Sequence, residues 1–255
     1  MEISLANIIG PVLAVGLRVS GLMLFAPFFS HTAIPPRIKV GLVIAITAVL
    51  YPVYSWHAEP FSLAQWPTLV GGEMLVGIAM GLATNAVIEA AQLAGQVLSI
   101  QMGYSLVNIL DPNTQVENQV LAIFHQGAAL LIFLSLGVHR WILRAIAQSF
   151  DYLPPGTALL TPVLSRALLH EGAIVLELGM QIAAPVLAAT LLADVVLGLL
   201  GKASPQMPLM LLGPAIKSML GVVLLGVTLA YWPRLFEAYF SKSITYTEQL
   251  LHLAR

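Results

Sequence analysis

Long apolar runs with almost no charged residue dominate this sequence, and they constrain the fold more than any other feature. A helix of about 20 apolar residues crosses a hydrocarbon core about 30 Å thick. Most of the runs come near that length, so we expect a membrane-type protein with several helices. The runs cover residues 8–29, 40–53, 69–109, 120–136, 174–200 and 209–232, and a break at Glu89 would divide the third run into two helices.

Composition excludes several other classes of protein. Of the 255 residues, 58% are apolar and 9% are charged, whereas a soluble domain carries about 25% charged residues. So few charges could not cover the surface of a soluble globule. The sequence contains no cysteine, which excludes a disulfide scaffold and thiolate metal sites. The formal net charge of -1 argues against nucleic acid as a partner. An integral membrane protein, or a buried subunit of a hydrophobic assembly, remains.

The segments between the runs carry residues that interrupt helices. Proline has no backbone donor and disfavours a helix immediately before it. We therefore expect helix boundaries near Pro35, Pro112 and Pro154. Pro185 lies inside the fifth run and predicts a kinked helix. No stretch alternates in the manner of a β-strand, so the predicted fold is all-α and polytopic, with long kinked helices and hairpins.

Small residues recur at helical spacing along the third run. Gly77 and Gly81 begin the row, and Gly95 and Gly103 lie on its continuation. Small residues in such a row let two helix backbones approach closely. The pattern leaves two interpretations open, which are an ordinary helix contact inside one chain and a packing face for other subunits.

The same run contains five amide side chains, which are costly in hydrocarbon unless they are hydrogen-bonded. A set of this kind fits a helix face that lines water, or one that bonds to neighbouring helices, better than a face in contact with lipid. We expect Gln92 and Gln96 to serve the lumen of an assembly or the packing between its subunits. The amides are Asn85, Gln92, Gln96, Gln101 and Asn108.

The end of the third run is the most unusual part of the sequence. From Gly103 to Asn113 it passes from a helical pattern through an apolar loop to a turn. Irregular backbone at membrane depth is tolerated where protein or a watery cavity satisfies it, and a hydrophobic constriction can close a pore by dewetting. This segment is either a gate or a plain re-entrant connection. The candidate gate residues are Gly103, Tyr104, Leu106, Val107, Asn108, Ile109, Leu110, Asp111 and Pro112.

Six Asp, Glu, Lys and Arg side chains lie inside the runs, and charged groups are functional candidates in a bilayer. Asp194 and Lys217 fall about 10 Å and about 13 Å from the turn between the last two runs at 1.5 Å per residue, so we expect them to pair. A proton-coupled small-molecule transporter would instead use Glu73, Glu89 or Asp194 as titrating carriers. The six residues are Arg18, Glu73, Glu89, Glu177, Asp194 and Lys217, of which we interpret Arg18, Glu73, Asp194 and Lys217 as structural charges.

Local motifs of enzymes and metal sites are absent from the sequence. It has no HExxH pattern, no phosphate-binding GxxxxGK[ST] loop and no GxSxG elbow. We therefore expect no catalytic residue, no metal and no cofactor.

Several short features follow one another in a specific order along nearly the whole chain. They are Arg18 with Pro27-Phe28 and Ile34-Pro35; Gly72-Glu73 with Gly77 and Gly81; Gly95-Gln96 with Gly103 and Asp111-Pro112; Ser149-Phe150 with Leu153-Pro154; and Pro185-Val186, Asp194, Leu197-Gly198, Pro205-Gln206-Met207, Pro214, Ile216 and Lys217. This order resembles the FliR family, the export-gate subunits of the flagellar type III secretion apparatus.

The resemblance implies an architecture and a set of partners. A FliP-like helical part would cover residues 1–171, and a FliQ-like hairpin with a C-terminal tail would cover residues 172–255. Residues 103–113 would plug the closed pore through which unfolded flagellar proteins are exported. The partners would be FliP, FliQ, FlhB and membrane lipid, in the bacterial inner membrane at the flagellar basal body. The plug would be sealed by aliphatic groups, because this stretch contains no phenylalanine. A homologue in an injectisome is the related alternative.

Overall fold

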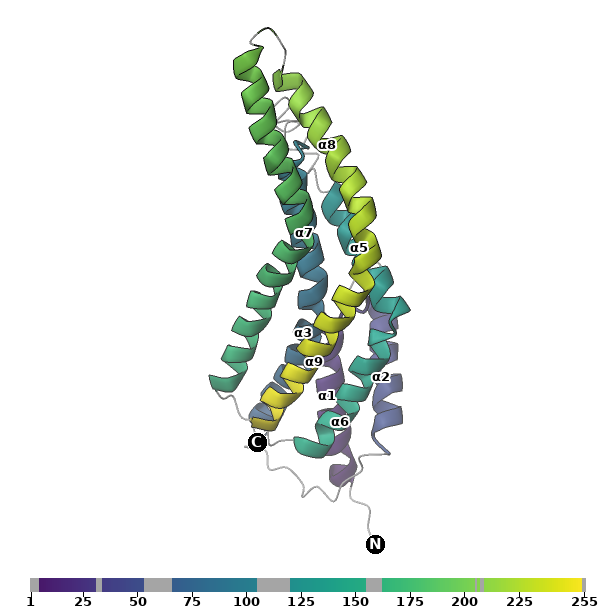
Figure 1. The fold of residues 1–255 in the computed structure, drawn as a ribbon. Coiled ribbons are helices and arrows are strands. Elements are labelled where there is room, and N and C mark those ends of the chain that lie inside the picture. The colour runs from purple at the N-terminus through teal and green to yellow at the C-terminus, as the bar shows by residue number, and fades with distance from the viewer. Residues whose placement is uncertain are drawn as a thin grey trace. The chain divides into compact units, whose positions relative to one another are not determined.

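A computed structural model of the chain describes residues 5–30, 34–52, 66–104, 120–154, 162–204, 206 and 209–253. Within these ranges the backbone forms helices and short turns and no strand, which confirms the predicted all-α fold (Figure 1). In chain order the elements are α1 (Leu5–Phe25), α2 (Pro36–Leu50), α3 (Trp66–Gln101), α5 (Val120–Ser135), α6 (Val138–Tyr152), α7 (Pro162–Ala203), α8 (Leu209–Thr228), the 3₁₀ turn η2 (Leu229–Tyr231) and α9 (Trp232–Leu253).

The third apolar run folds as one continuous helix, α3, of 36 residues. The alternative with two helices that break at Glu89 is therefore wrong. Between Pro67 and Gln101 the run contains no proline, and its many alanine and leucine residues favour helix. Nothing in this part of the sequence interrupts the ladder of backbone hydrogen bonds.

Two helices extend beyond the predicted runs. α7 begins at Pro162 instead of residue 174, because proline is tolerated in the first turn of a helix and the following leucine and alanine residues favour it. α9 lies outside the runs except for Trp232, since its apolar residues are interspersed with polar and charged ones. Its buried residues Phe236, Phe240 and Ser243 recur every three or four positions, which is typical of an amphipathic helix.

Three helical stretches in the described part of the chain are long and apolar enough to cross a membrane, and α5 with α6 would add a fourth if counted as one span. This is fewer than the six apolar runs, because Ile9–Phe25 of α1 is one of the shorter apolar helices and because α2 and α5 have only 15 and 16 residues. The most apolar window of Trp66–Gln101 is 67% buried within the chain, whereas those of Leu168–Ala203 and Leu212–Gln249 are 22% and 17% buried. The last two stretches therefore present most of their apolar surface to lipid or to other proteins.

The helices pack as two compact units. The first contains Met1–Ala86, Gly137–Ala173 and Phe240–Arg255, and the second contains Val87–Leu136 and Ile174–Tyr239. α3, α7 and α9 contribute residues to both units. Each unit is a group of residues that pack together, whereas the predicted domains are consecutive segments of the sequence divided after residue 171. That division stays a prediction.

In the first unit, α1 and α3 pack backbone against backbone. A Cβ atom added at Gly77 would collide with the carbonyl oxygen of Arg18 and lie 2.7 Å from the backbone nitrogen of Leu22. A Cβ atom added at Gly81 would lie 2.8 Å from the carbonyl oxygen of Leu22. The glycine row serves a helix contact inside the chain at these two positions.

α6 and the end of α9 complete the first unit. Ile146 and Phe150 of α6 are fully buried. In α9, Ser243 Oγ lies 2.7 Å from the carbonyl oxygen of Ala83 in α3 and 2.8 Å from Glu171 Oε2 in α7. These hydrogen bonds tie the last helix to two earlier ones.

In the second unit, α3 is contacted closely by α5 and by α7. A Cβ atom added at Gly95 would lie 2.6 Å from the Cα atom of Ala122, and one added at Gly179 would lie 3.0 Å from the carbonyl oxygen of Ala90. Gly95 therefore also serves packing inside the chain. α7 and α8 lie side by side as the two arms of a hairpin (Figure 1).

Candidate functional site

The predicted gate begins where α3 ends. Gly103 has a φ of +88°, its amide donates to the carbonyl oxygen of Ile100 at 3.1 Å, and the amide of Tyr104 donates to that of Ser99 at 3.0 Å. This pair of hydrogen bonds is a Schellman motif, which ends helices and favours glycine at the left-handed position. The chain therefore leaves the helix at the first residue of the candidate gate.

The rest of the candidate gate lies outside the described residues, so its conformation stays a prediction. The residues concerned are Leu106, Val107, Asn108, Ile109, Leu110, Asp111 and Pro112.

Residues 101–103, which we call the anchor segment, are held on one face of α8. Met102 is fully buried, and its carbonyl oxygen accepts a hydrogen bond from Ser218 Oγ at 2.9 Å. Its sulfur atom lies 2.6 Å from the place that a Cβ atom on Gly221 would take. A Cβ atom on Gly103 would lie 2.9 Å from the Cβ atom of Pro214. Pro214, Ser218 and Gly221 follow at helical spacing, so a single stripe of α8 contacts the anchor segment.

A polar cluster joins the anchor segment to the hairpin. Lys217 Nζ lies 2.9 Å from Asp194 Oδ1 across α7 and α8, the pairing that the hairpin register predicts. Gln101 Nε2 donates a hydrogen bond to Asp194 Oδ2 at 3.1 Å. The Lys217 and Asp194 side chains are 16% and 43% exposed, respectively. We call these three residues the aspartate cluster.

The other amides of α3 occupy different surroundings. Gln92 Oε1 accepts a hydrogen bond from Gln126 Nε2 of α5 at 3.2 Å, which is a bond to a neighbouring helix. Gln96 is exposed on the surface of the chain. Of the two, Gln96 is thus the one available to water or to another subunit.

The first unit contains a second charged cluster, which is fully buried. Arg18 Nε lies 2.7 Å from Glu73 Oε2, and both side chains are 0% exposed. Arg18 also donates to Ser149 Oγ at 2.8 Å and to the carbonyl oxygen of Leu153 at 3.0 Å. Its Cζ atom lies 4.0 Å from the centre of the Phe150 ring. This arginine cluster links α1, α3 and the end of α6 through one guanidinium group.

The sequence patterns do not predict several of these contacts. Arg18 and Glu73 are indicated as structural charges, but 55 residues separate them, and local spacing carries no information about such a pair. Ser218 and Gly221 were detectable as small residues at helical spacing in the last run, the same signal that marks the glycines of α3.

No group of three or more histidine, aspartate or glutamate residues in the described ranges is placed to hold a metal ion. The two charged clusters have the chemistry of helix-to-helix contacts, since each consists of a cation, a carboxylate and neutral hydrogen-bonding groups.

Comparison with known proteins gives matches over most of the chain. The profile of the family described as bacterial export proteins, family 1, matches residues 9–243. The flagellar biosynthetic protein FliR of Escherichia coli (strain K12) is 30% identical over 228 residues, which cover 89% of this chain and 87% of that protein. FliR of Pectobacterium carotovorum subsp. carotovorum is 29% identical, with 89% and 87% covered. FliR of Bacillus subtilis (strain 168) is 26% identical, with 98% of each chain covered.

Proposed function

Because this chain belongs to the bacterial export proteins, family 1, we propose that it is a FliR-type subunit of the flagellar export gate and forms part of its pore. The broader statement, a membrane component of the flagellar export apparatus, follows from the family and from the long apolar helices. The proposed pore carries unfolded flagellar proteins across the bacterial inner membrane. No catalytic step is part of the proposal.

The exposed apolar helices support the proposal of partner subunits. The windows of Leu168–Ala203 and Leu212–Gln249 are mostly uncovered by the chain itself. Other helical hairpins of the same kind would cover them, which fits FliP and FliQ as neighbours and the FliQ-like assignment of residues 172–255. FlhB is the further partner that we propose.

The observation that carries the gating part of the proposal is the way α3 ends. A gate segment needs a fixed point of attachment, and the anchor segment provides one through Ser218 and the close contact of Gly103 with Pro214. Immediately after this attachment the sequence places Leu106, Val107, Ile109 and Leu110 in an apolar stretch. We propose that this stretch plugs the closed pore by excluding water.

Deletion of residues 106–110 tests the plug. The complex is expected to assemble with its partners, because the anchor segment is untouched, and the membrane is expected to leak ions. Ion conductance of cells or proteoliposomes that contain the purified complex measures this. A matched variant keeps the length and changes Leu106, Val107, Ile109 and Leu110 to serine, which removes only the apolar character. If both variants assemble and conductance stays at baseline, the segment is not a plug.

The transporter alternative makes a different prediction for Glu73. Its Oε2 atom already accepts a hydrogen bond from Arg18 in a fully buried pair, which favours a structural role. Glu73→Gln would weaken assembly in a gate subunit, whereas it would abolish uptake in a transporter. Purification from detergent separates the two further, since a gate subunit copurifies with two small hydrophobic proteins and a transporter is isolated alone or as a homodimer.

A further inference from the structure

Three helices of the first unit meet at a buried glutamate that the proposed function does not use. Glu171 of α7 is 6% exposed. Its Oε2 atom lies 2.8 Å from Ser243 Oγ of α9, and the same Oγ atom lies 2.7 Å from the carbonyl oxygen of Ala83 in α3. One serine hydroxyl group therefore stands between a carboxyl group and a backbone carbonyl group.

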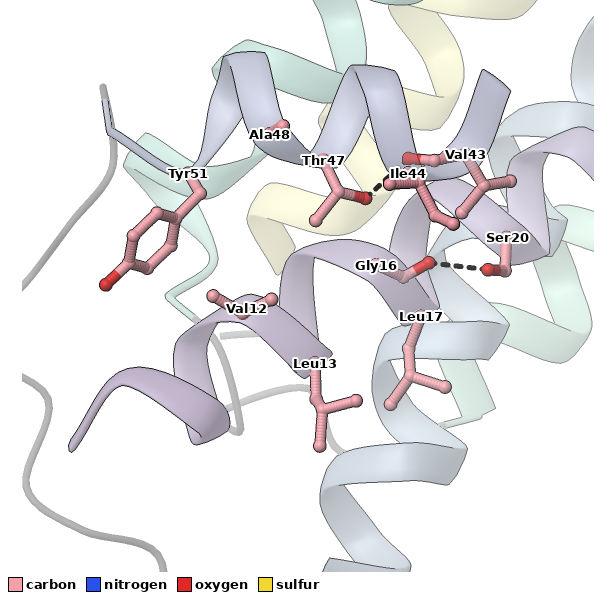
Figure 2. A pocket seen from close by; sticks show the side chains of 10 residues that line it. All are labelled: Val12, Leu13, Gly16, Leu17, Ser20, Val43, Ile44, Thr47, Ala48 and Tyr51. Atoms are coloured by element: carbon pink, nitrogen blue, oxygen red, sulfur yellow. Dashed lines mark hydrogen bonds between the residues drawn. The ribbon is translucent and has the colours of Figure 1, made fainter. Parts of the chain in front are cut away.

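This arrangement differs from that of other hydroxyl groups on the helices. A serine or threonine inside a helix commonly donates to the carbonyl oxygen one turn earlier in the same helix. Ser20 and Thr47 do so, with hydrogen bonds of 2.6 Å and 2.7 Å (Figure 2). The two partners of Ser243 instead lie on other helices, so its hydroxyl group connects α3, α7 and α9.

Ser243 has only one hydroxyl proton for these two contacts, although its oxygen can also accept. The carbonyl oxygen of Ala83 can only accept, so at 2.7 Å it takes the serine proton. The bond of 2.8 Å to Glu171 Oε2 then needs a proton from the glutamate, which a neutral carboxylic acid has and a carboxylate lacks. The opposite assignment, with the serine proton directed to Glu171, would leave two unprotonated oxygen atoms facing each other at 2.7 Å.

The second oxygen atom of Glu171 indicates the same protonation state. Within the described part of the chain, Oε1 is buried and has no hydrogen-bond partner. The buried carboxylate of Glu73, by contrast, is paired with Arg18 at 2.7 Å. Burying an isolated charge is far more costly than burying a neutral polar group. Glu171 therefore lacks the partners that an ionised carboxyl group needs in the interior.

The other titratable side chains near this site supply no counterion. Those described on the three helices are His170 of α7, Tyr239, Lys242, Tyr246 and Glu248 of α9, and Glu89 of α3. None of these six side chains forms a hydrogen bond or an ion pair with Glu171. The ring of Tyr246 packs against that of His170, with their centres 3.8 Å apart, and both Lys242 and Glu89 are exposed.

We propose that Glu171 is a proton-binding site, in which a neutral carboxylic acid donates to Ser243 Oγ and so joins α7 to α9 and α3. Loss of the proton leaves a charge on a buried group without a counterion, and the contact between α7 and α9 then opens to admit water. The protein therefore contains a helix contact that pH controls. The site lies outside the candidate gate, so this inference does not depend on the proposed function.

Infrared spectroscopy of the full chain in its copurified complex tests the protonation state, because the carbonyl stretch of a carboxylic acid is separate from the bands of a carboxylate. At neutral pH, the spectrum of the parent minus that of Glu171→Gln should contain the band of one carboxylic acid group. The matched control is Glu237→Gln, which changes an exposed glutamate of α9 and should remove only carboxylate bands. Ser243→Ala removes the acceptor of the proton and should shift the acid band to higher frequency.

The dependence of the melting temperature on pH gives a second measure. Glu171→Gln keeps a neutral side chain that can donate to Ser243, so it should match the parent at low pH. The folded parent holds a proton that the unfolded chain releases, so raising the pH favours unfolding. Relative to Glu171→Gln, the melting temperature of the parent should fall as the pH rises above about 4.3, where glutamate ionises in an unfolded chain. It should stop falling once the acid band has disappeared.

Three results would overturn the proposal. One is an acid band of equal intensity in the parent and in Glu171→Gln. Another is a difference spectrum that shows the loss of a carboxylate at Glu171. The third is a pair of melting curves for the parent and Glu171→Gln that depend on pH in parallel. If Glu171→Gln fails to assemble, Ser243→Ala decides the question, because an acid band that does not shift would mean that Glu171 donates no proton to Ser243.

Discussion

The arginine cluster and the aspartate cluster are built from the same kinds of side chain, yet their surroundings differ. The Arg18 and Glu73 side chains are fully buried, whereas Lys217 and Asp194 are partly exposed. A buried charge that loses its partner has no water to replace it, so breaking such a pair is strongly destabilising. A partly exposed charge exchanges its partner for water at little cost. The same kinds of side chain therefore form a permanent contact in the first unit and an exchangeable contact in the second.

The positions of the two clusters agree with this difference. The arginine cluster connects α1, α3 and the end of α6, beside the place where the backbones of α1 and α3 are in contact. The aspartate cluster includes Gln101 of the anchor segment, immediately before the candidate gate. We interpret the first as a permanent link and the second as a contact that can open and close.

The largest effect is expected from Glu73→Ala. This change leaves the Arg18 guanidinium buried without its carboxylate and should lower the stability of the protein by about 3–5 kcal/mol. Thermal unfolding of the purified complex measures this loss of stability. The yield of assembled complex extracted from the membrane gives a second measure.

The matched control for this prediction removes both charges. Arg18→Met combined with Glu73→Leu replaces the pair by apolar side chains of similar volume, and such replacements are often close to neutral. The double variant should therefore be more stable than Glu73→Ala. If it is less stable, the hydrogen bonds from Arg18 to Ser149 and Leu153 matter more than the ion pair.

The next effect concerns the backbone contact beside the arginine cluster. In Gly77→Ala the added methyl group would collide with the carbonyl oxygen of Arg18, so α1 must shift, at a cost of about 1–3 kcal/mol. Gly127 of α5 has no atom within 4 Å of an added Cβ, and Gly127→Ala should instead stabilise by about 0.5–1 kcal/mol. Opposite shifts in melting temperature of the two alanine variants are the expected result. Equal shifts would contradict the close approach of α1 and α3.

A smaller effect is expected at the anchor segment. Gly103→Ala places a side chain at a φ of +88° and against Pro214, which should cost about 1–2 kcal/mol in local strain. The anchor would loosen without unfolding the rest of the protein. Ion conductance should rise above the level of the parent complex, while the melting temperature changes little. Normal conductance in a correctly assembled variant would show that the anchor does not control the gate.

The fold class, two helix ends and one ion pair are predictable from the sequence. Composition and apolar runs predict an all-α membrane-type chain, and proline and glycine mark where α2 begins and where α3 ends. The pair of Asp194 with Lys217 follows from hairpin register, because both residues are counted from the same turn.

Contacts between segments that are far apart in the chain depend on tertiary packing, so no local sequence pattern predicts them. The pairing of Arg18 with Glu73 and Ser149 depends on how three helices meet, and no spacing rule connects these positions. The apolar runs do not include most of α9 for another reason, because its apolar residues form a stripe along one face of the helix and not a continuous segment.

The smallest effect is expected from the aspartate cluster. Its dependence on salt distinguishes it most clearly from the arginine cluster. A double-mutant cycle of Asp194→Asn and Lys217→Gln should give a coupling energy of about 0–1 kcal/mol, as for other partly exposed pairs. The Debye length falls from about 10 Å at 0.1 M salt to about 3 Å at 1 M, so this coupling should disappear at high salt. The equivalent cycle of Arg18→Met and Glu73→Leu should keep its value, because no solvent reaches that pair. A coupling at Asp194 that survives 1 M salt would mean that other subunits shield the cluster in the assembled complex, and the contact would then be as permanent as the buried one.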